Sequence, residues 1–119
     1  MARILIVEDE AILAFNTKME LIRLGHEVIG IADNGADAVN IAMERHPEII
    51  LMDIVLKGSM NGIEATGIIN KDNGCRIIYM TGHTDTATID MAMKTKHIGF
   101  LFKPVELYML KDAIEKALQ

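Results

Sequence analysis

The run Ile49-Ile50-Leu51-Met52-Asp53 decides the fold prediction for this chain. Four apolar residues in succession are typical of a short strand buried on both faces, as in a parallel sheet, and Asp53 stands where that strand ends. The polar groups that directly follow three other apolar runs are Glu8-Asp9, Thr81 and Lys103. If these runs are neighbouring parallel strands, their terminal side chains converge on one edge of the sheet, where open α/β folds place their sites.

Apolar runs recur along the whole chain, and each interval between them is long enough for a helix. The runs cover residues 4–7, 28–32, 49–52, 77–80 and 98–102. Strands that alternate with helices imply parallel, right-handed βαβ units. The sequence therefore predicts an α/β fold of five strands and five helices, forming one domain over residues 1–119.

Helix signals fill these intervals. Ile12, Phe15, Met19 and Ile22 repeat at helical spacing, and Gly25 is a suitable stop. The second helix must end before Pro47, and the third closes near Asn73-Gly74. The residues expected at the starts of the later helices are Asn34, Asn61-Gly62, Thr84 or Asp85, and Pro104.

Composition excludes several classes of protein. The net charge of −5 is the opposite of the basic surface that nucleic-acid binding requires. The single cysteine, Cys75, cannot form an internal disulfide, and no His/Cys cluster indicates zinc. The N-terminus does not resemble a signal peptide, and no apolar stretch approaches the roughly 20 residues of a membrane span. We expect a cytoplasmic protein that contacts neither nucleic acid nor membrane.

A meeting of Glu8, Asp9 and Asp53 at one sheet edge requires positive charge. Two like charges about 4 Å apart repel by about 4 kcal/mol at an effective dielectric of about 20. Lys103 supplies one positive charge, and a hard divalent cation, Mg²⁺ or Mn²⁺, would supply the rest. The cluster therefore predicts a metal site with room for a phosphoryl group.

Asp53 is then the natural nucleophile, because a carboxylate at a strand end can attack phosphorus and form an aspartyl phosphate. Lys103 would neutralise charge on the phosphoryl oxygens, and Thr81 would donate its hydroxyl to one of them. Each residue also has a plainer interpretation: an acidic first helical turn, a strand cap, an exposed lysine or a turn residue. The four coincidences together favour a site.

This set of motifs resembles the response-regulator receiver domain, the phospho-accepting module of two-component signalling, over essentially all 119 residues. The resemblance implies a doubly wound, flavodoxin-like three-layer fold of strand order 2-1-3-4-5. It implies that a histidine kinase or phosphotransfer protein phosphorylates Asp53 from phosphohistidine. Asp9, Asp53 and the backbone carbonyl of Val55 would bind Mg²⁺, with Glu8 acting through water. The Lys103–Pro104 bond would be cis.

The same resemblance implies a switch rather than an enzyme with turnover, since the domain catalyses only its own phosphorylation and dephosphorylation. Thr81 and Phe100 would be its switch residues, although Phe100 is equally well explained as a core residue. The fourth helix, fifth strand and fifth helix would form the surface for an output partner, for other domains of a longer chain, or for a homodimer. Candidates on it are Met91, Met93, Tyr108 and Met109, of which we expect at least half to be core instead.

Two departures from the family pattern concern the surroundings of Asp53. The stretch 54–61 lacks the common proline and is one residue longer, so we expect a more mobile loop. Val55 and His83 border the water path to the acyl phosphate in similar domains. Val55 cannot orient water, and we expect His83→Ala to affect the phosphorylated lifetime less than Thr81→Ala affects the response.

Three other classes of protein fit less well. A haloacid-dehalogenase-like phosphatase needs a second aspartate at the position of Val55. A receiver-like module without phosphorylation would lack an acidic-pair residue or Lys103. A flavodoxin-like cofactor binder would carry a glycine-rich loop after the first strand.

Overall fold

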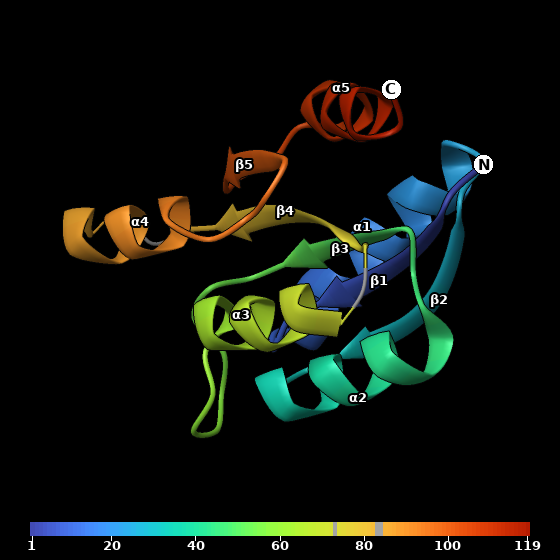
Figure 1. The fold of residues 1–119 in the computed structure, drawn as a ribbon. Coiled ribbons are helices and arrows are strands. Elements are labelled where there is room, and N and C mark those ends of the chain that lie inside the picture. Colours follow the sequence, from blue (N-terminus) through green and yellow to red (C-terminus); the bar gives the residue numbers. More distant parts are fainter. Residues whose placement is uncertain (73, 83–84) are drawn as a thin grey trace.

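The sheet in the computed structural model has five parallel strands in the order β2-β1-β3-β4-β5 (Figure 1), which confirms the predicted class and strand order. The structure describes residues 1–72, 74–82 and 85–119. The strands are β1 (Arg3–Val7), β2 (Glu27–Ala32), β3 (Ile49–Met52), β4 (Arg76–Thr81) and β5 (Gly99–Phe102). The helices are α1 (Ala11–Arg23), α2 (Gly35–Arg45), α3 (Gly62–Asp72), α4 (Thr86–Met93) and α5 (Leu107–Ala117).

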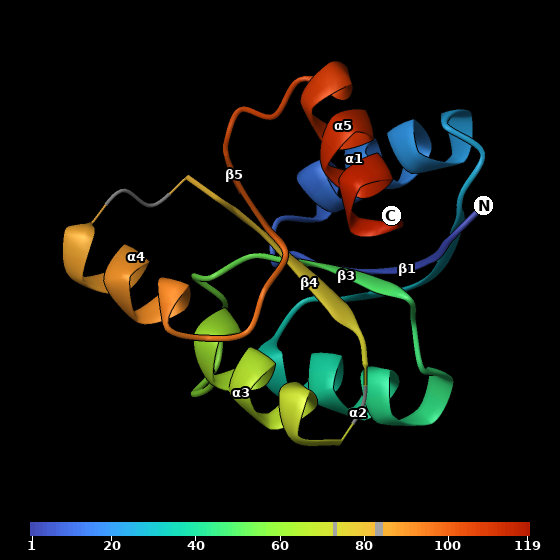
Figure 2. The ribbon, with the colours of Figure 1, turned by 45° about the horizontal axis from the view of Figure 1, so that its top comes forward.

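Helices cover both faces of the sheet, which gives three layers (Figure 2). Successive side chains of β1 point to opposite faces, so Leu5 and Val7 pack with α2 and α3, whereas Ile4 and Ile6 pack with α1 and α5. Strands buried on both faces must be apolar at every position, which explains the continuous runs in the sequence. Within the described part of the chain, no helix combines the length and apolar character needed to cross a bilayer.

The helix boundaries follow the capping signals. Asn34 accepts a hydrogen bond from the backbone of Asp37 at the start of α2 (2.9 Å). Asn61 and Glu64 each bond the other's backbone N–H at the start of α3, forming a capping box. Asp85 caps α4. The predictions that concern Asn73, His83 and Thr84 fall outside the described residues.

Two groups of apolar residues lie on the surface. The four residues that repeat along α1 all face outward, while Ala14 and Leu21 turn toward the sheet. The exposed fractions of the four are 77% for Ile12, 57% for Phe15, 43% for Met19 and 47% for Ile22.

The second group corrects a prediction. We expected at least half of Met91, Met93, Tyr108 and Met109 to be core residues, but the first three are exposed and Met109 is half-buried. The expectation was wrong for Met91 and Met93 because α4 buries only Ala92. It was wrong for Tyr108 because α5 turns Leu110, Ile114 and Ala117 toward the core instead.

Candidate functional site

The polar residues that follow the strands are held in place by an extension of the sheet ladder. The backbone N–H of Asp53 donates to the carbonyl of Val7 (3.0 Å), and that of Lys103 donates to the carbonyl of Thr81 (2.9 Å). The N–H of Glu8 donates to Ala32 in the same way (2.9 Å). Because each bond continues regular pairing beyond a strand end, all these side chains start from one edge of the sheet.

Glu8, Asp9 and Asp53 form a tight carboxylate cluster at that edge. One oxygen of each lies within 4.8 Å of the others. Glu8 and Asp53 are buried, and Asp9 is partly exposed. The structure thus brings together the three acidic residues that the sequence singled out.

Lys103 partly balances this cluster. Its Nζ lies 2.9 Å from Asp53 Oδ2 and also donates a short hydrogen bond to Glu8. Burial alone would lower the pKa of Lys103, but its hydrogen bonds to Glu8 and Asp53 and the charges of both outweigh that effect, so the pKa is raised. Among the described residues, one ammonium faces the three carboxylates of this cluster, which leaves it with an excess of negative charge.

The donor set fits a hard divalent cation. Magnesium prefers oxygen ligands and is usually bound through one or two carboxylates, with water and phosphate completing its coordination. A shallow cavity of about 420 Å³ opens onto the cluster, and Asp9, Asp53, Val55, Thr81 and Lys103 are among its lining residues. Thr81 is buried at the end of β4, and its neighbour Gly82 also lines the cavity. The cavity has room for a phosphoryl group beside Asp53.

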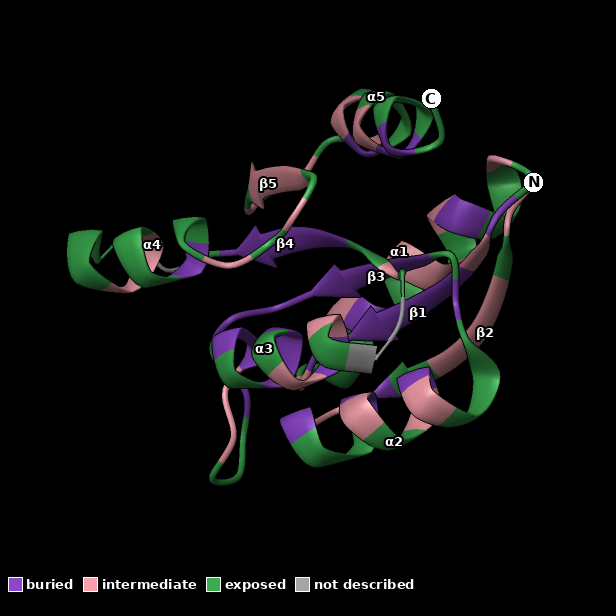
Figure 3. Ribbon diagram, in the orientation of Figure 1, coloured by how far each residue is buried: buried purple, intermediate pink, exposed green. Residues whose placement is uncertain are grey.

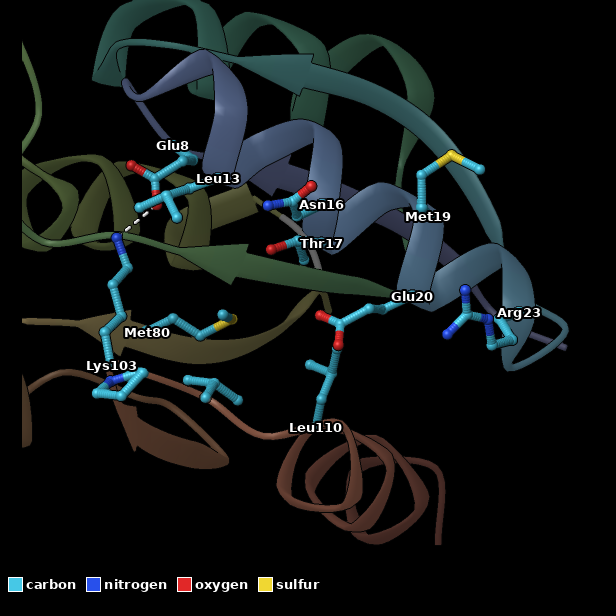
Figure 4. A pocket seen from close by; sticks show the side chains of 12 residues that line it. Glu8, Leu13, Asn16, Thr17, Met19, Glu20, Arg23, Met80, Lys103 and Leu110 are labelled. Carbon is cyan, nitrogen blue, oxygen red and sulfur yellow. Dashed lines mark hydrogen bonds and ion pairs between the residues drawn. The ribbon is translucent and has the colours of Figure 1, made fainter.

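A second, larger cavity lies on the other side of the Lys103–Glu8 ion pair, between α1 and α5 (Figure 4). Its volume is about 700 Å³. Asn16 and Thr17 extend into it from α1, and Met80 and Leu110 line it from the sheet and from α5. The ion pair is therefore reached from two sides and is not sealed within the core.

Gly62 is a residue whose role the sequence analysis missed. A Cβ at this position would lie 2.0 Å from the backbone oxygen of Asp53, a distance that no side chain can occupy. The Gly62 N–H also donates to the carbonyl of Ile54 (2.8 Å). The first residue of α3 thus packs directly on the backbone of Asp53, and only glycine permits that contact. The sequence signal is present in Asn61-Gly62, but by itself this pair indicates only the start of a helix.

The long segment between β3 and α3 is attached to the turn before α2. The Lys57 ammonium lies 2.7 Å from Asp33 Oδ2, and the backbones of Asn34 and Lys57 form an isolated parallel bridge. Gly35 allows Met60 to approach, since a Cβ there would lie 2.7 Å from the Met60 oxygen. Asp33 and Lys57 are thus a second charged pair near this edge that the sequence analysis did not identify.

Phe100 lies in a row of aromatic rings next to the site. Its ring centroid is 5.6 Å from that of the buried Tyr79 and 5.1 Å from that of the exposed Phe102. Phe100 itself is half-buried. The Lys103–Pro104 peptide bond, which follows β5, is cis.

These features are those of a known family. The model of the response regulator receiver domain matches residues 4–115. The chain belongs to that family. Receiver domains are the signalling switches of two-component response regulators, and both the chemistry and the connectivity of the sheet edge described above accord with that membership.

Individual proteins show how widely this receiver domain is shared. The chain is 35% identical to the chemotaxis protein CheY of Thermotoga maritima, over 96% of this chain and 95% of CheY. It is 32% identical to the DNA-binding response regulator MtrA of Mycobacterium tuberculosis, over 86% of this chain. The match covers only 44% of MtrA, so the chain spans less than half the length of that relative.

Solved structures agree with the fold. The signal receiver domain of a modulated diguanylate cyclase from Desulfovibrio desulfuricans G20 superposes with a TM-score of 0.94 at 35% identity, covering 99% of this chain and 94% of that one. A CheY-like receiver domain protein from Methanospirillum hungatei JF-1 gives a TM-score of 0.91 at 26% identity, with the same coverage of both chains.

Proposed function

We propose that this receiver domain accepts a phosphoryl group on Asp53 from a phosphohistidine, with Mg²⁺ bound at Glu8, Asp9 and Asp53. The observation that carries the proposal is the meeting of three carboxylates and Lys103 beside a cavity that Thr81 also lines. In the transfer, an Asp53 oxygen forms a bond to phosphorus while the bond from phosphorus to the histidine nitrogen breaks, and the imidazole leaves with the electron pair of that bond.

Each residue of the site would have a distinct role in this transfer. Lys103 lies within hydrogen-bond distance of Asp53, so its ammonium would stabilise the charge that develops on the phosphoryl oxygens. Asp9 and Asp53 would hold the cation together with the carbonyl of Val55, and Glu8 would act through water. When bound, Mg²⁺ would neutralise negative charge on the phosphoryl group. The Thr81 hydroxyl would then donate to a phosphoryl oxygen and act, with Phe100, as the switch.

Incubation with acetyl phosphate and Mg²⁺ tests the acceptor. The intact mass should rise by one phosphoryl group in the wild type, and chelation of Mg²⁺ should prevent the rise. Asp53→Asn should remain unmodified. Asp33→Asn is the matched control, because Asp33 also follows a strand at this edge but pairs with Lys57 outside the cluster. Phosphorylation of Asp53→Asn, or its loss in Asp33→Asn alone, would contradict the proposal.

The outward face of α1 would serve as the docking surface for the protein that donates the phosphoryl group. Ile12, Phe15, Met19 and Ile22 follow one another at intervals of three, four and three residues, the spacing of a seam between packed helices. The helix begins two residues after Asp9, so this seam adjoins the acceptor. Lys18 and Arg23 lie beside it in the sequence, which favours a donor helix with acidic residues around an apolar stripe.

A charged residue introduced into this seam distinguishes docking of the donor protein from the phosphoryl transfer itself. The test uses a histidine kinase that phosphorylates the wild type. We expect Phe15→Asp to reduce the rate of phosphoryl transfer from this kinase by about tenfold or more. Phosphorylation by acetyl phosphate should be unchanged, since Phe15 does not line the acceptor cavity. Met91→Asp is the control, because Met91 is equally exposed at 57% but lies on α4. An equal loss of transfer from the kinase in both variants would contradict docking of the donor on α1.

The face formed by α4, β5 and α5 is proposed as the output face. Met91 and Met93 of α4 and Tyr108 of α5 are exposed, and a groove of about 600 Å³ lies between β5 and α5. Phe100 lines that groove and also contacts Tyr79, so a turn of its ring would alter both the core and the surface. This face would bind an output partner, another domain of a longer chain or a second copy. Phe100→Ala should leave phosphorylation intact and weaken that binding.

A further inference from the structure

The hydroxyl of Tyr79 joins the sheet to the turn that follows α4. Tyr79 is fully buried in β4, and its oxygen lies 2.7 Å from the Thr95 hydroxyl. Thr95 in turn donates to the carbonyl of Ala92 (2.6 Å). A threonine hydroxyl has one hydrogen, so Tyr79 must be the donor in the bond between the two side chains. Burial raises the pKa of Tyr79, which keeps that donor proton in place.

Within the described part of the chain, this bond is one of few that attach the region of α4 and its following turn to the sheet. The helix buries only Ala92, and it extends away from the sheet in both views (Figures 1 and 2). A second polar contact in the described part of this region joins Asn70 of α3 to the carbonyl of Lys96 (3.1 Å), but it is exposed to solvent. The part-buried bond from Tyr79 to Thr95 therefore restrains the turn between α4 and β5, together with the backbone hydrogen bond from Ile98 to the carbonyl of Ile77 (2.8 Å).

A second hydroxyl lies beside Tyr79. Thr66 of α3 is fully buried, and within the described residues its oxygen has no hydrogen-bond partner of acceptable geometry. It is nevertheless close enough to the Tyr79 hydroxyl to exert a lowering influence on the pKa of that group. Buried hydroxyls without a partner are rare in folded proteins, so an unpaired Thr66 calls for an explanation.

We propose that Tyr79 is a latch with two positions and that Thr66 is its reserve partner. A phenolic hydrogen lies near the plane of its ring and can point to either side. While it points to Thr95, the turn after α4 is held against the sheet. When the turn moves away, the hydrogen rotates to Thr66, and the buried donor remains satisfied. Thr66 thereby makes detachment of α4 easier than it would be with an apolar residue at that position.

The position of the latch connects it with the acceptor edge. Thr81 lies two residues beyond Tyr79, so both side chains point to the same face of β4. The ring of Phe100 packs against Tyr79 from β5, and that of His97 packs against it from the turn. Rearrangement of Phe100, whose ring packs against Tyr79, would thus act directly on the residue that restrains the turn after α4.

Amide hydrogen exchange on the unphosphorylated protein tests the latch, so the outcome does not depend on whether Asp53 accepts a phosphoryl group. Tyr79→Phe removes only the hydroxyl and should speed exchange in residues 86–98 by roughly threefold to tenfold, the effect of one hydrogen bond. Amides of β1 and β3 serve as the reference for global stability. Unchanged exchange in 86–98 relative to that reference would overturn the proposal.

Thr66 provides the sharper half of the test. Thr66→Val keeps the shape of the side chain and should slow exchange in 86–98 in the wild-type background, because the reserve partner is gone. In the Tyr79→Phe background the same substitution should have no such effect. Thr66→Ser keeps the hydroxyl and should behave as wild type. If Thr66→Val speeds exchange, or acts equally in both backgrounds, Thr66 is not the reserve partner.

Discussion

The strands β3 and β5 both contain four residues, yet their surroundings differ. All four residues of β3 are buried, whereas three residues of β5 are half-buried and Phe102 is exposed. Figure 3 shows β3 in the colour of buried residues and most of β5 in that of intermediate ones. Strand β3 pairs on both sides, with β1 and β4, while β5 pairs only with β4. The central strand ends in Asp53, and the edge strand leads to Lys103. Asp53 thus follows a strand that is fixed in the core, and its lysine partner follows the less buried edge strand.

Truncation of the last residue of each strand tests this comparison with the largest expected effect. Met52→Ala removes a fully buried side chain from β3 and should lower the free energy of unfolding by about 2–5 kcal/mol. Phe102→Ala removes a larger side chain that is 48% exposed, and we expect a loss of about 1 kcal/mol or less. Urea unfolding measures both. Equal losses would show that the two strands are equally integrated into the core.

Two glycines of α3 provide the next test. Gly62→Ala places a methyl group against the Asp53 backbone and should destabilise the fold by about 1–3 kcal/mol while slowing phosphorylation by acetyl phosphate. Gly67 lies in the same helix with no atom within 4 Å of an added Cβ. Gly67→Ala should therefore stabilise the protein, by about 0.5–1 kcal/mol. If Gly62→Ala changed neither the stability nor the rate of phosphorylation, α3 would not position Asp53.

Loss of the Lys103 charge is expected to reduce the stability of the protein by an amount that depends on Mg²⁺. Lys103→Met leaves the buried carboxylates of Glu8 and Asp53 without their ammonium partner, which should reduce stability by roughly 1–3 kcal/mol in the presence of a chelator. Because Mg²⁺ would replace the lost charge, it should raise the melting temperature of this variant more than that of the wild type. Lys57→Met, at an exposed ion pair, is the control. A smaller gain from Mg²⁺ in Lys103→Met would contradict a metal site there.

The smallest expected effect concerns His26, which lies where the strands begin, at the opposite end of the sheet from the site. His26 Nδ1 accepts a hydrogen bond from the backbone of Ala2 (3.0 Å), and burial followed by the charge of the N-terminus lowers the pKa of His26. The unfolded chain, with a pKa near 6.5, then binds the proton more readily than the folded one. The contribution of His26 to stability is therefore complete above about pH 6.5 and declines as the pH falls below it.

His26→Gln checks this sign. Its melting temperature should fall less than that of the wild type between about pH 7.5 and pH 5.5, because the difference in proton binding is gone. Neither β3 nor β5 contains this residue, so phosphorylation of Asp53 should be unaffected. A larger fall in the variant would mean that the folded state favours protonated His26.

The sequence was sufficient for the strands and the site because each depends on a simple pattern. Continuous apolar runs identify strands that are covered on both faces, and parallel pairing then brings their ends together, which is why Glu8, Asp9, Asp53 and Lys103 could be placed in advance. Roles for the individual residues came from the family resemblance, and they remain predictions.

Contacts between distant segments could not be predicted in this way. The packing of Gly62 on Asp53 depends on the angle at which α3 leaves the loop, and periodicity does not report that angle. The bond between Tyr79 and Thr95 joins residues from a strand and a turn that share no motif. Exposure of Met91 and Met93 follows from the sparse packing of α4, whereas composition alone suggested a more complete core.

The distribution of the charged residues along the chain has a consequence for synthesis. Glu8 and Asp53 leave the ribosome well before Lys103, which is 50 residues beyond Asp53 and 95 beyond Glu8. A nascent chain would thus carry the acidic cluster for some time without its ammonium group. The residue that completes the cluster directly follows β5, the last strand along the chain, so competence for signalling would not precede formation of the whole sheet.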